Sequence, residues 1–307
     1  MKAITDTAGS RNGRKHETYF RVFPALLCGS LFVSTFSVST SSQQPPPFST
    51  TIEAVRVDAL VTDRGQPVRG LTAADFEVVD NGVPQQVDLV SFEQIPLNVV
   101  LALDMSDSVA GERLDHLRSA GRAALALLEK GDQAALVTFS HIVTLGAPLT
   151  AGAAAVREAL DRAAGSGQTS LLDGAFAGLM IGESDVGRAL LIVFSDGLDT
   201  ASFLTAAAVL DAAKRSDVVV YGVSVQSAAK PEFLRDLTSL TGGRLFELEK
   251  TTDLASTFRA IVDEFRHRYL VSYSPRGVSK EGWHRLEVRV KRRDVTIKAR
   301  PGYLASS

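Results

Sequence analysis

Hydroxyl and carboxylate side chains follow one apolar stretch of the sequence at alternate positions. The stretch LNVVLALD, residues 97–104, ends in Asp104, and Ser106 and Ser108 come directly after it. A buried strand gains nothing from an acid and two hydroxyls at its tip, because buried polar groups cost free energy unless they are paired. Oxygen atoms at this spacing could bind a hard cation, cap a helix or form a turn.

Two further segments carry oxygen groups at the ends of expected elements. Thr169 lies in GSGQTSLLDG, just before a helical pattern, and Asp196 follows the apolar run ALLIVFS in the triplet SDG. Ligands of open α/β sheets bind at the carboxyl ends of strands, where the strand order reverses. Two carboxylates and three hydroxyls suit Mg²⁺ first, and then Mn²⁺ or Ca²⁺. The neighbouring Asp107, Asp173 and Asp199 are expected to support the site or face solvent.

In residues 97–268, strand-like and helical patterns alternate, which is typical of an α/β domain. Several of the expected strands are apolar on both faces, as strands in a sheet covered by helices on each side must be. We therefore expect a doubly wound, mostly parallel six-stranded sheet with helices on both faces. The segment from His141 to Pro148 is expected to be an antiparallel edge strand, and the last helix to span Asp253 to Arg268. The strand-like runs are LNVVLALD, AALVTFS, IVTLGAP, ALLIVFS, VVVYGVSV and GRLFELE.

The segments on either side of this domain have β character. Residues 51–96 alternate apolar and polar positions and contain an Asn-Gly pair, a common hairpin turn, between two strand-like runs. In residues 269–307, Leu286, Val288 and Val290 face one way along a strand. Neither segment has enough apolar residues for its own core. We expect the two to pair as one small β accessory domain.

The N-terminus has the pattern of an export signal. A basic leader precedes an apolar or small stretch from Val22 to Val38, so residues 1–39 are expected to be a signal peptide and residues 40–50 a Ser/Gln/Pro-rich linker. A membrane anchor is the alternative, although Ser and Thr dilute the apolar run. The cysteine at position 28 lies within the signal, so no disulfide is expected after cleavage. The expected location is periplasmic, cell-surface or extracellular.

The charge distribution is uneven along the chain. The chain has 307 residues and a formal charge of −2, but residues 266–300 hold eleven Lys and Arg against three Asp and Glu. Residues 40–265 carry a formal charge near −13. An acidic body argues against nucleic acid as its partner.

The three polar segments together resemble the von Willebrand factor A-type domain, which integrin I domains share. The resemblance rests on Asp104-Met-Ser106-Asp-Ser108, on Thr169 in GQTSLLDG and on Asp196 in SDG. It implies a metal-ion-dependent adhesion site, with Ser106 and Ser108 binding the metal directly and Asp104 acting mostly through water. Thr169 and Asp196 would bind directly or through water. The flanking β segments also resemble a bacterial family described as VWFA-related.

This resemblance implies a non-enzymatic module in which the metal meets an Asp or Glu carboxylate of a partner protein. An alternative is a structural or assembly module of the cell envelope whose metal only stabilises the fold. A phosphatase of the haloacid dehalogenase type also has an aspartate after its first strand, but it needs a second acid where this chain has Ser106. Each polar residue alone could also be a cap or turn former: Ser106 and Ser108 for the helix near Gly111, and Thr169 for the helix that follows it.

Overall fold

The computed structural model describes most of the chain beyond the expected export segment. The signal peptide and linker predicted for residues 1–50 lie outside the described residues. Within the described part, no helix is both long and apolar enough to cross a membrane. The described residues are 54–92, 95–183, 187–225 and 230–305.

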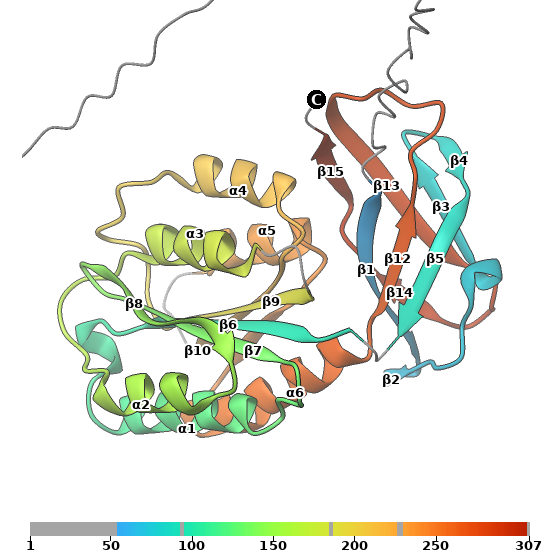
Figure 1. Ribbon diagram of the computed structural model, residues 1–307. Helices are drawn as coiled ribbons and strands as arrows, with labels where there is room; N and C mark the ends of the chain where they lie inside the picture. The colour runs from blue at the N-terminus through green and yellow to red at the C-terminus, as the bar shows by residue number, and fades with distance from the viewer. Residues whose placement is uncertain (1–53, 93–94, 184–186, 226–229, 306–307) are drawn as a thin grey trace, which may run out of the picture. The chain divides into compact units, whose positions relative to one another are not determined.

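The described residues of the α/β domain form a six-stranded sheet in the order β11-β10-β9-β6-β7-β8 (Figure 1). All neighbours are parallel except β7 and β8, because β8 is an antiparallel edge strand. The expected fold class, including the edge strand, is confirmed. The strands are β6 (Leu97–Asp104), β7 (Gln133–Phe139), β8 (Val143–Ala151), β9 (Arg188–Ser195), β10 (Val219–Val225) and β11 (Leu245–Leu248).

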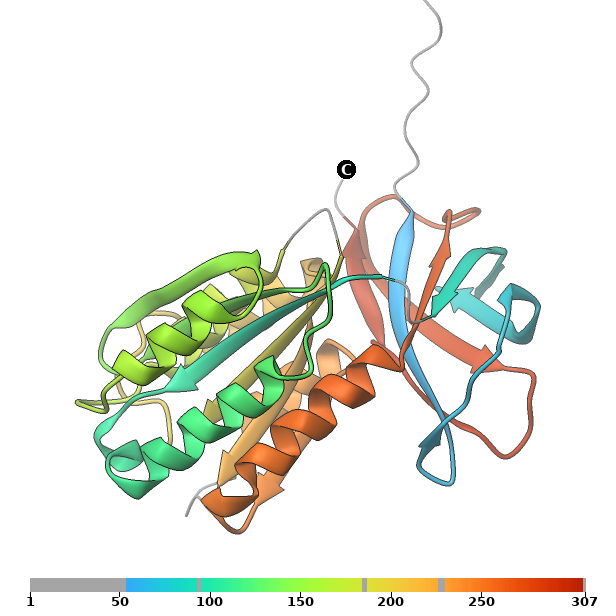
Figure 2. The ribbon, with the colours of Figure 1, turned by 60° about the horizontal axis from the view of Figure 1, so that its bottom comes forward.

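Helices cover both faces of this sheet. Helices α1, α2 and α6 pack on one face, and α3, α4 and α5 pack on the other, as Figures 1 and 2 show. Every residue of β6 is buried, which explains its unbroken apolar run. The helices are α1 (Glu112–Leu125), α2 (Ala154–Arg162), α3 (Leu171–Gly182), α4 (Ala206–Arg215), α5 (Glu232–Leu240) and α6 (Leu254–Arg266).

Helix α3 lies unusually close to the sheet. A Cβ atom added to Gly174 would lie 2.3 Å from a Phe139 ring carbon, and one added to Gly178 would lie 2.6 Å from Leu191 Cδ1. Only glycine permits this approach, since real Cβ atoms do not come so near to other carbons. The glycine spacing in LLDGAFAGLMIG therefore sets the position of α3 and of Thr169, which precedes it by two residues.

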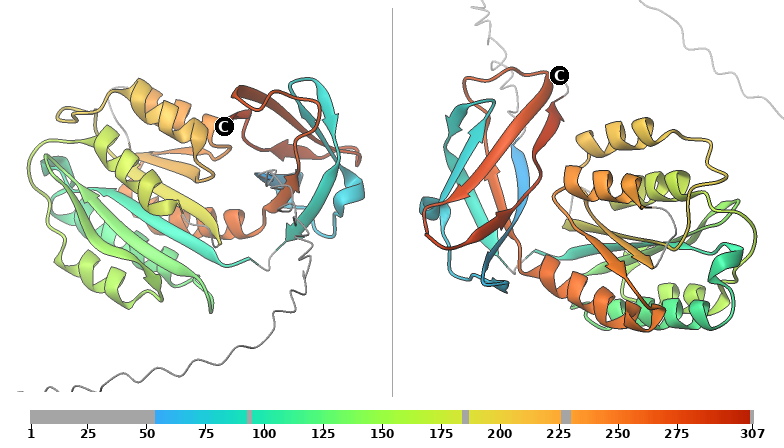
Figure 3. Two further views of the ribbon diagram at one scale, coloured as in Figure 1. Left: turned by 45° about the horizontal axis from the view of Figure 1, so that its top comes forward. Right: turned by 180° about the vertical axis from the view of Figure 1, so that it is seen from behind.

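The flanking segments form a β sandwich of two antiparallel sheets. One sheet has the order β14-β1-β12-β5, with β2 paired to β1, and the other has the order β15-β13-β3-β4. Strands from opposite ends of the chain, blue to cyan and orange to red, lie side by side in Figure 3. The expected β domain made from both flanks is thus part of the confirmed fold. Its strands are β1 (Val55–Asp63), β2 (Gln66–Pro67), β3 (Phe76–Asp80), β4 (Val83–Gln85), β5 (Val87–Phe92), β12 (Tyr269–Tyr273), β13 (Gly282–Val290), β14 (Thr296–Lys298) and β15 (Gly302–Ala305).

The local sequence signals of this sandwich act as expected. Asn81 and Gly82 both have positive φ, and they join β3 to β4 in a two-residue turn. Along β13, Leu286 and Val288 are buried in the core between the sheets while Glu287 and Arg289 alternate with them. The core is therefore built jointly by strands that are about 200 residues apart in the chain.

A buried acid ties the two sheets of the sandwich together. Asp80 is fully buried, and its Oδ2 accepts hydrogen bonds from Tyr273 Oη at 2.8 Å and Tyr303 Oη at 3.0 Å. Its Oδ1 lies 2.7 Å from Nδ1 of the buried His284. A buried carboxylate is tolerated because these donors replace its water.

Replacing Tyr303 by Phe should lower the free energy of unfolding by about 1 kcal/mol, because it removes one of the donors to Asp80. Urea denaturation followed by circular dichroism measures the change. As a control, Ser239→Ala removes an exposed hydroxyl on α5 and should change stability by less than about 0.5 kcal/mol. Equal stability of the Tyr303→Phe variant and the parent would show that Asp80 does not need this bond.

Candidate metal centre

Asp104 ends β6 at the point where the strand order of the sheet reverses. The chain passes from β6 to β7 on one side, whereas β9 lies on the other side of β6. Asp104 Oδ1 accepts a hydrogen bond from Ser106 N at 2.9 Å, and Oδ2 accepts one from Ser195 Oγ at 2.7 Å. Because Ser195 ends β9, donors from two adjacent strand ends orient this fully buried carboxylate.

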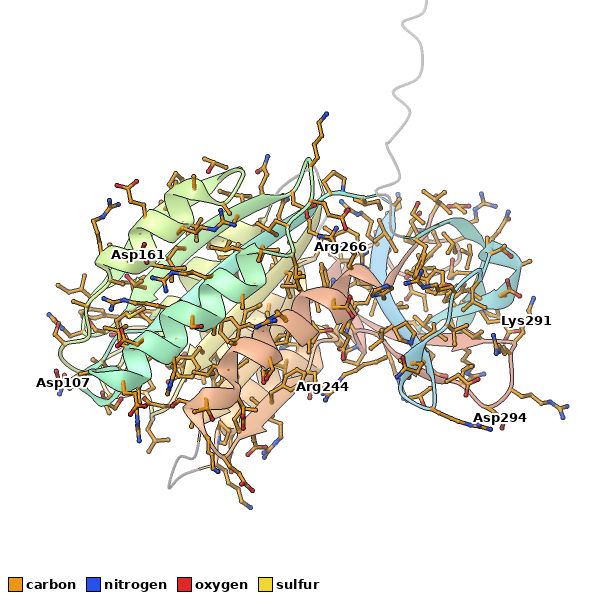
Figure 4. The ribbon with its side chains drawn as sticks, turned by 90° about the horizontal axis from the view of Figure 1, so that it is seen from below. Asp107, Asp161, Arg244, Arg266, Lys291 and Asp294 are labelled. Carbon is orange, nitrogen blue, oxygen red and sulfur yellow. The ribbon has the colours of Figure 1, made fainter. Side chains whose placement is uncertain are left out.

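Ser106, Ser108 and Asp196 form a continuous chain of polar contacts. The two hydroxyl oxygens are 3.0 Å apart, and Ser108 Oγ donates to Asp196 Oδ1 at 2.6 Å. Ser108 and Asp196 are 88 residues apart in the sequence, so only the parallel pairing of β6 and β9 brings them together. Asp107, the residue between the two serines, is labelled at this end of the α/β domain in Figure 4.

The helix-cap alternatives are wrong. Ser106 precedes a short 3-10 helix, Asp107–Val109, but its side chain makes no capping bond there. The residue before α1 is Gly111, and the residue before α3 is Ser170 rather than Thr169. The hydroxyls of Ser106 and Ser108 therefore turn toward each other and toward Asp196 instead of toward a helix end.

Thr169 joins this group from the loop that leads into α3. The side chain is buried, and a methyl group built on Gly197 would lie 3.7 Å from its Oγ1. Its backbone nitrogen donates to Thr200 Oγ1 at 3.0 Å, and its carbonyl accepts from Thr200 N at 2.8 Å. These bonds tie Thr169 to the loop that follows Asp196, so all five predicted residues gather at one edge of the sheet.

Burial raises the pKa of the Asp104 carboxyl above its usual value, while hydrogen bonds from Ser106 and Ser195 act in the opposite direction. The nearby negative charge of Asp196 raises this pKa further. Two carboxylates at one buried edge therefore repel each other, and a cation placed between them would relieve that repulsion.

Two residues of this cluster escaped prediction from the sequence. Ser195 supplies a hydroxyl to Asp104, and Arg113 Nη1 donates to Asp196 Oδ2 at 2.9 Å. The Asp196 side chain is 2% exposed and that of Arg113 is 53% exposed. Ser195 was visible beside Asp196 in the triplet SDG. Arg113 gave no signal, since a basic residue in the first turn of a helix is ordinarily solvated.

The three neighbouring acids hold the loops around the cluster. Asp107 Oδ1 accepts from Gly167 N at 2.9 Å, and Asp199 Oδ1 accepts from Ser202 Oγ at 2.5 Å. Asp173 accepts two backbone N–H groups of the loop before α4. Each of these carboxylates is thus engaged with donors of the protein, and each supports a loop beside the five oxygen-bearing residues.

The donor set of this cluster suits a hard divalent cation. Among the described residues, no group of three or more His, Cys, Asp and Glu side chains could hold a metal. A metal at this edge would therefore depend on the Ser and Thr hydroxyls together with the two carboxylates. Hydroxyl ligands are neutral, so a cation bound by them stays electron-poor and Mg²⁺ would keep coordination positions for water or an external oxygen.

Residues 98–260 match the family model of the von Willebrand factor type A domain, and this match covers more than half of the chain. The chain belongs to the von Willebrand factor A domain family. A search of curated proteins gives no match. The domain boundaries 97–268 that the sequence predicts remain a proposal, as does the division of the flanks at residues 51–96 and 269–307.

Solved structures share the fold of this A domain at low sequence identity. Proximal thread matrix protein 1 from the mussel byssus is 15% identical with a TM-score of 0.52, covering 66% of this chain and 51% of that one. This chain therefore spans about half the length of the mussel protein. A second structure of that protein has a zinc-occupied MIDAS motif, that is, a metal-ion-dependent adhesion site. It is 16% identical with a TM-score of 0.52, and the match covers 61% of this chain and 49% of that one.

A bacterial structure extends the likeness beyond the A domain. The von Willebrand factor type A protein from Catenulispora acidiphila is 13% identical with a TM-score of 0.50. The match covers 84% of this chain and 76% of that one. Because the family model covers only residues 98–260, a match of this extent includes part of the flanking β strands.

Proposed function

We propose that this chain is an exported protein-binding module in which Mg²⁺ bridges to an Asp or Glu carboxylate of a partner protein. Asp104, Ser106, Ser108, Thr169 and Asp196 would hold the metal. The observation that carries the proposal is the chain of contacts from Ser106 through Ser108 to Asp196, beside the oriented carboxylate of Asp104. The bound metal would supply an electrophilic position for an external oxygen ligand.

Mn²⁺ or Ca²⁺ could take the same oxygen ligands, and the mussel protein with its zinc-occupied MIDAS motif supports divalent-metal binding within this fold. Export is proposed from the basic leader and the apolar stretch that follows it. The module is proposed to be non-enzymatic and to have no nucleic-acid partner.

A pull-down from envelope extracts of the source organism tests this function. Residues 50–307 form one compact unit and serve as the bait, with Mg²⁺, with EDTA, and with Mg²⁺ restored after EDTA. We expect a protein partner that is lost on chelation and recovered with Mg²⁺. Partners that ignore chelation would contradict the metal bridge and support the structural module. Phosphatase turnover that depends on Asp104 would instead support an enzyme.

Replacing Arg113 by Gln should raise the affinity for Mg²⁺ about two- to fivefold. The guanidinium contacts Asp196 Oδ2 and repels a cation at the same carboxylate, although its exposure screens this repulsion. Calorimetric titration with MgCl₂ at low and high ionic strength measures the change, which salt should reduce. Arg235→Gln, at a similarly exposed arginine on α5, is the control. A weaker affinity in Arg113→Gln would show that Arg113 instead orients Asp196 for the metal.

A further inference from the structure

The loop between β9 and α4, which begins with Asp196, exposes two large apolar side chains. Leu198 is 56% exposed and Phe203 is 95% exposed. Leu198 lies two residues after Asp196, and Phe203 lies later in the same loop, the long yellow segment that leads into α4 in Figure 1. A scattered exposed apolar residue is ordinary, but two in the one loop that begins at a proposed metal ligand favour a surface for a partner.

Hydrogen bonds fix the backbone that presents these side chains. Phe203 N and Leu204 N each donate to a carboxylate oxygen of Asp173 at 2.9 Å. Thr200 N donates to Thr169 O at 2.8 Å, which ties the middle of the loop to a proposed metal ligand. Phe203 is therefore exposed on a loop whose backbone is hydrogen-bonded to α3 and to Thr169, and such bonds reduce the entropy that a partner must pay to order it.

A second loop, the turn between β7 and β8, also exposes an apolar side chain. Ile142 is 61% exposed in the turn between β7 and β8. This turn is tied to the site because Ser170 N donates to Ser140 O at 2.8 Å. Two loops that expose apolar side chains are thus both hydrogen-bonded to the segment that carries Thr169.

The charges around this surface limit the kind of partner that fits. Asp107 and Glu112 are exposed beside the serines, and their charges oppose a partner with a run of acids. The guanidinium of Arg113 reaches the cluster and is already engaged with Asp196. A partner with one carboxylate and apolar neighbours would meet the metal without placing further acids against Asp107 and Glu112.

We propose that Leu198 and Phe203, with Ile142, form the apolar part of the partner-binding surface, so that the partner presents one Asp or Glu beside an aromatic or branched aliphatic side chain. This inference rests on the proposed function, because the partner's carboxylate would bind to the Mg²⁺ of that proposal. The apolar side chains supply the contacts that distinguish one acidic partner from another.

Short synthetic peptides on an array test this inference with the full chain in Mg²⁺ buffer. Each peptide carries one central Glu in a Gly/Ser background, with Phe, Leu or Ser at the neighbouring positions. Two further sets carry Gln in place of Glu, or a run of Glu. We expect the tightest binding for one Glu flanked by Phe or Leu. If such peptides bind no better than the same peptides with Ser neighbours, the inference is wrong.

Variants separate the apolar surface from the metal centre. Phe203→Ser should lower the affinity for peptides with one Glu flanked by Phe or Leu about tenfold, and Leu198→Ser should lower it somewhat less. The Mg²⁺ affinity of both variants, measured by calorimetry, should be unchanged. Leu89→Ser, at a 54% exposed leucine on β5, is the matched control and should bind as the parent does. Loss of binding in Asp104→Asn but not in Phe203→Ser would overturn the inference and leave the proposed function standing. Binding that persists in EDTA and in Asp104→Asn would overturn the proposed function itself.

Discussion

Replacing Asp104 by Asn should weaken Mg²⁺ binding by about 10- to 100-fold and abolish metal-dependent partner binding. Asparagine has the same shape, and its amide can accept from Ser106 N and donate to Ser195 Oγ, so the two hydrogen bonds of the carboxylate are replaced. What is lost is the negative charge that acts on the cation. Calorimetric titration with MgCl₂ and pull-down in Mg²⁺ buffer measure the two effects.

The fold should survive this replacement. The pKa of Asp104 is raised in the folded protein by burial, so its ionised form lowers the free energy of unfolding at pH values above that pKa. A neutral Asn removes this cost, and the melting temperature without metal should be equal or higher. Asp115→Asn, which removes an exposed acid on α1, is the control and should bind Mg²⁺ as the parent does. Unchanged Mg²⁺ affinity in Asp104→Asn would remove Asp104 from the metal site.

Replacing Asp58 by Ala should lower the free energy of unfolding by about 3–5 kcal/mol. Arg188 Nε donates to Asp58 Oδ1 at 2.7 Å, and the side chains are 2% and 9% exposed. The pair joins β1 of the sandwich to the start of β9 in the α/β domain. Alanine would leave the Arg188 guanidinium buried beside Phe265 without its counter-ion, which is far more costly than losing both charges together.

Equilibrium denaturation of a double-mutant cycle measures this effect. Arg188→Met and the double variant Asp58→Ala/Arg188→Met complete the cycle, and the double variant should be more stable than the sum of the single changes predicts. The exposed pair of Arg235 and Glu247 is the matched control, because Glu247→Ala should cost less than about 1 kcal/mol. If Asp58→Ala lowered the free energy of unfolding by no more than Glu247→Ala does, the ion pair between Asp58 and Arg188 would contribute little to stability.

These two replacements differ in how far the sequence anticipates them. Asp104 was predicted as a site residue because an acid at the tip of an apolar strand is unusual in itself. Asp58 stands in an alternating strand pattern, where an acid is typical of a solvated face. The structure shows that the side chain of Asp58 is buried where it pairs with Arg188 at the start of β9. Arg188 stands at the beginning of an apolar run, and nothing in that run indicates that its side chain is buried.

Local patterns in the chain were enough to predict the fold class, the six strands of the sheet, the joint β domain and the five residues proposed to hold the metal. These features are encoded locally, because apolar periodicity reports which face of a strand or helix is buried and the end of each strand is visible in the chain. The carboxyl ends of parallel strands then meet at one edge by topology alone.

The contacts between polar side chains became known only from the folded structure. Ser195 orients Asp104, Arg113 contacts Asp196, and Phe203 is held outward by a carboxylate of α3. Each of these contacts joins residues that are tens of residues apart, and its free energy depends on distances of a few ångströms that packing sets. No local pattern carries such distances, so the partners of these side chains became known only with the fold.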